Sequence, residues 1–392
     1  MKKIWILLIF IFFFSALNCR ADEVLTEDKI IEEYSQDESI NSNLNSLYTY
    51  IDNMKTDIEL INDLNPVEYI KSYIKNGEGN ISFSLILKSV VSLIFKEVKT
   101  VLKLSLSIIV IAILCSLLKN IQDALSSDSI SNIAFYACYL VLILILSKSF
   151  LVSISIAKEA IYGISDFMNG ILPILVSIIA LSGGAMEVAT LDPIILVAVL
   201  IIPKIYVNII IPLILISFVL EFANNLSEEH KINNLCKTIK QITRWLQGII
   251  ITIFIATLTI RGITSSTIDA VTLKTTKFAI DNFIPIVGKA FSDAISSVVG
   301  YSLIIKNAIS SMGLLILVLI ILYPIIKIVL ISFIYKMSAA LTEPISDKRI
   351  TSSIEGAGNA MVLLLSCILS VSLMFFVLFA IIASAGKFIV GG

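Results

Sequence analysis

Charged residues are scarce in this 392-residue chain, in which Asp, Glu, Lys and Arg together make up 15%. Ordinary soluble domains carry roughly 25%. Hydrophobic residues reach 57%, and the mean hydropathy is +0.96. A soluble protein of this composition would have too little polar surface to stay dispersed, whereas a bilayer can take over the role of the buried core. The composition therefore excludes an ordinary soluble domain and predicts an integral membrane protein.

Residues used in metal and acid–base chemistry are almost absent. The single histidine, His230, lies in a polar stretch, so histidine-based catalysis would have to rest on one residue. The five cysteines form no C-x-x-C pair, which argues against a structural zinc site. The phosphate-binding loop G-x-x-x-x-G-K-[ST] is missing, and so are H-E-x-x-H and G-x-S-x-G. We therefore expect a protein that is not an enzyme, with no catalytic residues, no cofactor and no metal.

The N-terminus has the layout of a secretory signal peptide, which we place at residues 1–21. Lys2 and Lys3 are followed by an apolar stretch at 4–17, and Cys19-Arg20-Ala21 supplies small residues at the −3 and −1 positions. Two alternatives stay open: lipid attachment at Cys19 and an uncleaved anchor helix. In each case, residue 22 onward begins on the outer side of the membrane.

Residues 22–100 are predicted to form an acidic, helical, extracytoplasmic segment. Between 22 and 78 the chain has 14 acidic residues and four lysines, which disfavours nucleic acid as a partner. Pro66 suits the first turn of a helix, and Gly-Glu-Gly-Asn at 77–80 marks a break. The amphipathic stretch 82–99 could lie on the membrane surface before the first span.

Residues 101–392 are predicted to form an all-α, polytopic membrane domain with about six spans. Each span is near the ~20 residues that cross the hydrocarbon core. The apolar runs that carry this prediction lie at 101–118, 133–151, 205–220, 245–260, 314–333 and 361–385. The protein is therefore expected to have the lipid bilayer as its main surroundings.

A less regular apolar block lies between the second and third of these runs. Ser182-Gly183-Gly184-Ala185 interrupts it, and we interpret 171–202 as a broken-helix hairpin. The basic residues in 221–244 place that stretch in the cytoplasm by the positive-inside rule, which requires an odd number of crossings after residue 152. The alternative, two full spans in place of the hairpin, would leave four positive charges outside.

Residues 263–310 are predicted to form an amphipathic helical hairpin, because charged residues punctuate an otherwise apolar sequence. Pro285 lacks an N–H and Gly288 can adopt positive φ, so a turn at 282–288 is favoured. Two interpretations stay open. The hairpin is interfacial with solvated charges, or its polar stripe lines an aqueous path when several copies form a homo-oligomer. By the same count of crossings this region lies outside, whereas its four lysines and the nearby Arg261 favour the cytoplasmic side, so its side of the membrane stays open.

Ionisable and helix-breaking residues inside apolar segments are the remaining functional candidates. A charge at the bilayer centre costs at least ~2.5–3.5 kcal/mol, although a long lysine side chain can reach the interface instead. Broken apolar segments near mid-membrane also occur in transporters, where unwound backbone binds ions or substrate. The candidate pathway or structural positions are Gly183, Gly184, Lys204, Pro212, Pro285, Gly288 and Lys327.

Several stretches of the chain are similar to one known family. The most specific is 269–278, Asp-Ala-Val-Thr-Leu-Lys-Thr-Thr-Lys-Phe, which continues through Asn-Phe-Ile-Pro-Ile-Val-Gly-Lys at 282–289. Shorter matches are Leu-Ser-Gly-Gly-Ala at 181–185, Asp-Pro-Ile-Ile-Leu at 192–196, Ile-Pro-Leu-Ile at 211–214, Phe-Ile-Tyr-Lys at 333–336 and Val-Ser-Leu-Met-Phe-Phe at 371–376. With these stretches the chain resembles the stage III sporulation protein AE family from about residue 80 to 385.

The resemblance implies a role in endospore formation after engulfment. Family members belong to a multiprotein channel or feeding complex of the mother-cell membrane that faces the forespore, together with an ATPase and ring-forming proteins similar to those of secretion systems. This chain would be the permease-like membrane subunit, and the family supplies no catalytic residues to carry over. The alternative left by the residues alone is a self-contained secondary transporter of small solutes or ions.

Overall fold

The computed structural model describes six stretches of the chain, and in all of them the regular structure is helical, with no strand among the described residues. The all-α prediction is therefore confirmed. The predicted signal peptide at 1–21 and most of the N-terminal segment lie outside the described residues. The described stretches are 66–76, 83–125, 128–182, 184–226, 232–283 and 288–384.

The first two described helices are α5 (Pro66–Asn76) and α6 (Phe83–Leu125). Pro66 opens α5 as predicted, because a residue in the first helical turn needs no backbone donor. The stretch 82–99 differs from the expectation of a separate surface helix. It continues directly into the first span, since no proline or glycine occurs within α6 to end it.

The helix α7 (Asp128–Leu181) ends at the small-residue cluster, where the sequence predicts an interruption. The Ser182 hydroxyl donates to the Ile179 carbonyl at 2.8 Å, and the Gly184 N–H donates to the same oxygen at 3.0 Å. A Cβ on Gly184 would lie 2.6 Å from Cγ2 of Ile179, so this tight turn requires glycine.

The block expected as a broken-helix hairpin at 171–202 differs from the structure beyond this turn. Residues 171–181 are the last part of α7, and the return helix does not stop near 202. It runs as α8 (Ala185–Ile205), a π-helical turn η1 (Tyr206–Ile210) and α9 (Ile211–Leu226) without interruption. Residues 185–226 therefore form one continuous helix that is long and apolar enough to cross a membrane once, in keeping with the odd number of crossings expected from the charges.

Two local devices allow prolines inside this long helix. Pro203 has no N–H to give to the Val199 carbonyl, and the Ser165 hydroxyl of α7 donates to that carbonyl at 2.8 Å instead. Pro212 follows the π turn, in which the Ile211 N–H bonds back to the Tyr206 carbonyl. The wider turn gives room where a proline ring would meet the carbonyl four residues earlier.

Three further helices complete the fold: α10 (Asn233–Phe283), α11 (Gly288–Thr342) and α12 (Lys348–Ser384). The predicted amphipathic hairpin at 263–310 is not a separate unit, because its limbs are the end of α10 and the start of α11. Both limbs are helical and Gly288 begins the second one, whereas Pro285 lies outside the described residues.

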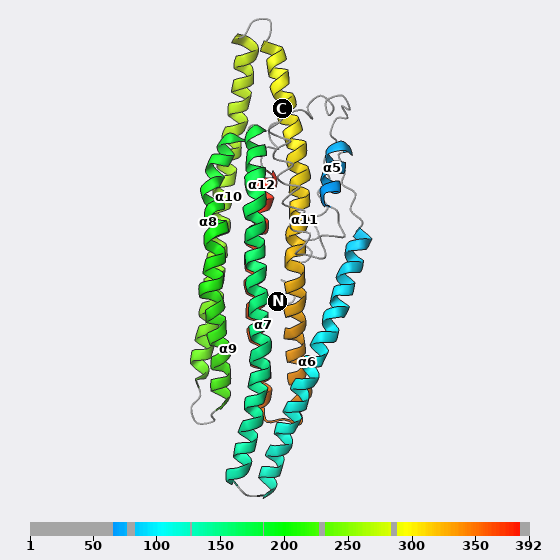
Figure 1. Cartoon of the computed structure of the whole chain (residues 1–392). Helices are drawn as coiled ribbons and strands as arrows, with labels where there is room; N and C mark the ends of the chain where they lie inside the picture. The colour runs from blue at the N-terminus through cyan, green and yellow to red at the C-terminus, as the bar shows by residue number, and fades with distance from the viewer. Residues whose placement is uncertain are drawn as a thin grey trace.

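The long helices form one elongated bundle in which successive members run up and down (Figure 1). The connections α6–α7, α9–α10 and α11–α12 lie at one end, which we name the α11–α12 end. The α7–α8 and α10–α11 connections lie at the opposite end, which we name the α10–α11 end. Helix α12 is central, packing against α7, α9, α10 and α11, and most of its side chains are buried.

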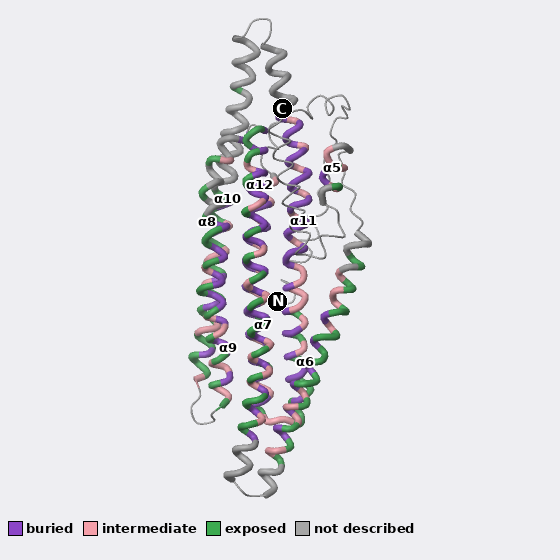
Figure 2. The backbone as a smooth tube through the Cα atoms, viewed as in Figure 1, coloured by how far each residue is buried: buried purple, intermediate pink, exposed green. Residues whose placement is uncertain are grey.

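Within the described residues, six helical stretches are long and apolar enough to cross a membrane. Large apolar side chains also point outward from these helices, as the exposed residues in Figure 2 indicate. On α6 they form a stripe at three- and four-residue spacing, comprising Leu102, Leu106, Val110, Leu114 and Leu117. An apolar outer face of this extent is what lipid contact requires.

Candidate functional site

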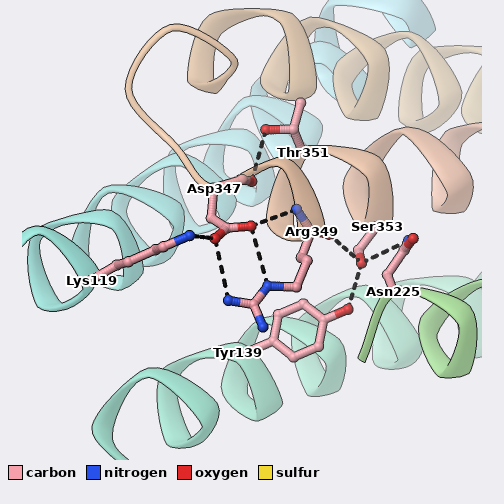
Figure 3. A network of polar contacts seen from close by, with 7 residues as sticks. All are labelled: Lys119, Tyr139, Asn225, Asp347, Arg349, Thr351 and Ser353. Carbon is pink, nitrogen blue, oxygen red and sulfur yellow. Dashed lines mark hydrogen bonds and ion pairs between the residues drawn. The ribbon is translucent and has the colours of Figure 1, made fainter. Parts of the chain in front are cut away.

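The most connected polar group described at the α11–α12 end is the carboxylate of Asp347, which lies in the short connection between those helices (Figure 3). Its side chain is only 4% exposed. It accepts the backbone N–H of Arg349 at 2.7 Å, which makes Asp347 the N-cap of α12. It also forms ion pairs with the Arg349 guanidinium, at 3.3 Å, and with Lys119 of α6.

These contacts determine the charge state of Asp347. Burial alone would raise the pKa of the carboxyl group, because it disfavours the ionised form. The hydrogen bond from Lys119, with those from Arg349, outweighs burial and holds the pKa of Asp347 below its ordinary value. Asp347 is therefore an anion at neutral pH, saturated by donors from α6 and α12.

A second branch of the same network reaches α7 and α9. The Ser353 hydroxyl lies 2.6 Å from the Tyr139 hydroxyl of α7 and accepts the side-chain N–H of Asn225 from α9 at 3.2 Å. Ser353 in turn donates to the Arg349 carbonyl at 2.7 Å. The Arg349 guanidinium stacks over the Phe135 ring at 4.6 Å. One network thus ties four helices of the bundle together at the α11–α12 end.

The α11–α12 connection is also held from the side by α6. The Ser346 hydroxyl donates to the Ala112 carbonyl at 3.2 Å, and the Ser116 hydroxyl donates to the Ile345 carbonyl. The Ile345 carbonyl lies outside both helices and gains a donor from α6, while the Ser346 bond ties the same connection to the interior of α6, so the two contacts fix the connection in place. No group of acidic, histidine and cysteine side chains in the described part of the chain could hold a metal ion. We name the network of Lys119, Tyr139, Asn225, Asp347, Arg349 and Ser353 the clamp, because it joins four helices through hydrogen bonds and ion pairs.

A separate ion pair joins α9 to α10. The Lys240 ammonium lies 2.5 Å from the Glu221 carboxylate, and both side chains are about one-fifth exposed, at 17% and 20%. A Cβ on Gly356 of α12 would lie 2.2 Å from Cγ of Glu221. The small residue at 356 therefore lets the carboxylate lie directly against α12, so three helices meet at this pair.

The sequence-predicted Lys327 has a partner that the sequence did not reveal. Its ammonium donates to the Tyr323 hydroxyl at 2.7 Å and lies 3.6 Å from the Glu97 carboxylate of α6. The Lys327 and Glu97 side chains are 20% and 10% exposed. Lys327 thus helps to join α11 to α6. Glu97 was missed because its stretch reads as a surface helix in the sequence.

The remaining predicted positions are not gathered into one site. Lys204 lies exposed on α8, Pro212 is in the first turn of α9, and Gly184 is at the α7–α8 turn. Gly288 starts α11 at the α10–α11 end. Gly183, like Pro285, lies outside the described residues. Of the described positions, Gly184, Pro212 and Gly288 therefore lie at a turn or at helix starts, and Lys204 lies near the end of α8.

The clamp residues, by contrast, were not singled out from the sequence. Asp347 and Arg349 occur in a short polar connection, where a solvated charge is the usual explanation. A weak signal was available, because an aspartate just before a helix is a preferred N-cap. The contact with Lys119, 228 positions away, could not be inferred from one sequence.

Comparison with known proteins gives a consistent result for this chain. The family described as Stage III sporulation protein AE matches residues 64–386, which include every contact described above. The chain is similar to the Stage III sporulation protein AE of Bacillus subtilis (strain 168), with 32% identity over 312 residues. That alignment covers 80% of this chain and 78% of the relative. No solved structure matches the chain.

Proposed function

Because the chain belongs to the stage III sporulation protein AE family, we propose that it is a membrane subunit of the mother-cell-to-forespore channel complex needed for endospore formation after engulfment. The observation that carries the proposal is the family match over residues 64–386. Six long apolar helices and an outer face suited to lipid support the membrane part. The role is structural and not enzymatic.

The proposed orientation rests on charge. Basic residues of three helices lie near the α11–α12 end: Lys119 of α6, Lys237 and Arg244 of α10, and Lys348 and Arg349 of α12. Positively charged residues flank the cytoplasmic ends of membrane helices, so this end faces the mother-cell cytoplasm. The opposite, α10–α11 end then faces the forespore across the space between the two membranes.

The proposed partners follow from what the chain does not supply. The sequence has no phosphate-binding loop, so the energy for any transport comes from a separate ATPase subunit. Ring-forming proteins and further copies of the chain are the other proposed partners. A self-contained secondary transporter is the competing function, but Lys204, its best charged candidate, lies on the outside of the bundle.

The test is deletion of the gene in its spore-forming host, followed by measurement of late transcription in engulfed forespores. Arrest after engulfment, restored by a wild-type copy, is the expected result. Complementation with Lys204→Ala should also restore spores, because the exposed lysine is not in the bundle interior. Normal spores from the deletion strain would refute the sporulation role.

The proposed orientation has its own test. A single cysteine placed at His230, in the α9–α10 connection, should react with a membrane-impermeant maleimide only after the cells are opened. Reaction in intact cells, at the rate of an externally exposed control protein, would reverse the proposed orientation.

A further inference from the structure

The outer face of α10 is covered less than any other apolar helix surface described in the bundle. Of the six apolar helical stretches, the one at Asn233–Ile260 has the smallest buried share. Helices α8, α9 and α12 pack against its inner side, where Thr243, Gln247 and Leu258 are buried. The outward residues of α10 therefore meet whatever surrounds the protein in the membrane, and their chemistry indicates what that is.

Two cations lie on this outer face without a protein anion. Lys237 and Arg244 are exposed, and neither forms an ion pair with a described residue. Lys240, which lies between them in the sequence, is paired with Glu221 instead. The stretch 233–260 contains no Asp or Glu of its own. The two positive charges are therefore available to an anion from outside the chain.

The two cations are placed to share one anion. Lys237 and Arg244 are seven residues apart, a rise of about 10 Å, and Gln241 lies between them on the same face. Lysine and arginine have long side chains, which can converge over that glutamine. A phosphate group has several acceptor oxygens, so one phosphate can accept from the ammonium, the guanidinium and the glutamine amide together.

An aromatic and then an apolar surface continues from these cations along α10. Trp245 follows Arg244 directly and is 66% exposed, and tryptophan prefers the boundary between lipid headgroups and acyl chains. Beyond it, Ile249 and Ile253 form an exposed ridge at four-residue spacing. The outer face therefore has a cationic part, an interfacial aromatic residue and an apolar part, in that order.

Small residues lie beside this ridge and leave room for an acyl chain. Gly248, Thr252 and Ala256 are all exposed and repeat every four residues after the arginine. A Cβ on Gly248 would meet no atom within 4 Å. The Thr252 hydroxyl donates to the Gly248 carbonyl at 2.8 Å, so its donor is satisfied within the helix. A hydrocarbon chain that lies along this row therefore leaves no hydroxyl donor unpaired.

We propose that the outer face of α10 is a binding site for a phospholipid with an anionic headgroup. The headgroup phosphate lies between Lys237 and Arg244, the Trp245 ring packs where headgroup and acyl chains meet, and one acyl chain follows the row that begins at Gly248. Charge complementarity carries this inference, because two cations without a protein partner begin an apolar surface that is open to lipid. The inference concerns the chain alone and does not depend on the proposed sporulation role.

The first test uses the fluorescence of Trp245 in phosphatidylcholine vesicles. Trp5 is the other tryptophan of the chain, so Trp5→Phe leaves Trp245 as the only indole. Brominated phosphatidylglycerol or brominated phosphatidylcholine is added at the same low mole fraction, because bromine quenches only an indole that it touches. We expect the anionic lipid to quench about twofold more strongly. Equal quenching by the two lipids would overturn the proposal.

Matched charge removals show whether this preference belongs to the site. Lys237→Gln with Arg244→Gln should bring the quenching ratio of the two lipids to about one. Lys148→Gln with Lys204→Gln removes the same charge from exposed positions on α7 and α8 and should keep the ratio of the parent chain. Parent-like unfolding midpoints confirm that both double variants are folded. An equal fall in both would mean that diffuse surface charge attracts the lipid, which would overturn the site.

The last test asks whether a second copy of the chain covers this face instead. In a chain whose native cysteines are alanine, Thr252→Cys is oxidised with copper phenanthroline in membranes. Ile216→Cys on α9, where the native side chain is 46% exposed, is the control for random collisions. We expect equally low yields of cross-linked dimer from both. A dimer yield at 252 well above the control would mean that protein occupies the row of small residues, and the lipid site would be wrong.

Discussion

Replacing Asp347 with alanine removes the centre of the clamp at the α11–α12 end. The substitution deletes the N-cap of α12, a change that costs about 1 kcal/mol on average. It also leaves Arg349 and Lys119 without their anion. Removing one partner of a fully buried pair costs about 3–5 kcal/mol, but these cations are 22% and 34% exposed, so water screens part of the loss. We expect a total loss of about 2–4 kcal/mol.

The Asp347→Asn variant separates the two contributions. The asparagine side-chain oxygen can still accept the Arg349 N–H, so the cap persists while the charge is lost. We expect this variant to lose about half as much stability as the alanine variant. Thermal unfolding of the purified chain in one detergent, followed by tryptophan fluorescence, gives the midpoints for both variants and for wild type.

The two outcomes that would refute this reasoning are distinct. An alanine variant with the wild-type midpoint would mean that the clamp does not stabilise the bundle. An asparagine variant as unstable as the alanine variant would mean that the cap contributes nothing and the charge everything. Glu343→Gln, an exposed change in the same connection, is the control and should leave the midpoint unchanged.

Three further predictions concern described contacts. Folding lowers the pKa of Asp347, so the stabilisation by its carboxylate is complete above the unfolded pKa of about 3.8 and is lost as pH falls through the lower folded pKa. A titration of protein stability against acid pH should show this loss in wild type and not in Asp347→Asn. Gly356→Ala should lower stability by about 1–3 kcal/mol, because the new Cβ would lie 2.2 Å from Cγ of Glu221 in α9. Gly248→Ala is the control and should not lower stability, because a Cβ there meets open space. An unchanged unfolding midpoint for Gly356→Ala would contradict the close packing. Lys327→Met should destabilise the chain by leaving the Glu97 carboxylate unpaired, and adding Glu97→Gln should recover part of the loss; strictly additive midpoints would show that the two groups do not interact.

Much of the fold follows from local features of the sequence. The apolar runs predict the number of crossings, and the small residues at 182–185 predict the α7–α8 turn. Helix lengths were harder to predict, because a charged pair such as Lys158-Glu159 ends an apolar run in the sequence without ending the helix. A helix continues through such a pair when its backbone stays hydrogen-bonded. Likewise, Pro203 predicts a helix break, because the sequence does not show that the Ser165 hydroxyl replaces the missing proline N–H at the Val199 carbonyl.

The candidate site depends almost entirely on long-range contacts. Lys119 meets Asp347 and Glu97 meets Lys327 only because α6 runs parallel to α11. A single sequence contains no signal for that pairing, because each residue alone resembles an ordinary boundary charge. The sequence therefore identifies charges with an unusual position, as it did for Lys327, but not the partners that give them a role.

The central position of α12 has a consequence for how the protein is made. This helix is the last of the described helices to leave the ribosome, yet α7, α9, α10 and α11 all pack against it. Before α12 is inserted, the faces of those helices that contact it are not yet packed, and the contacts of Asp347 and Arg349 in the clamp cannot form. Assembly of the bundle is therefore completed only after synthesis of the last described helix, so its packing is post-translational for every helix that contacts it.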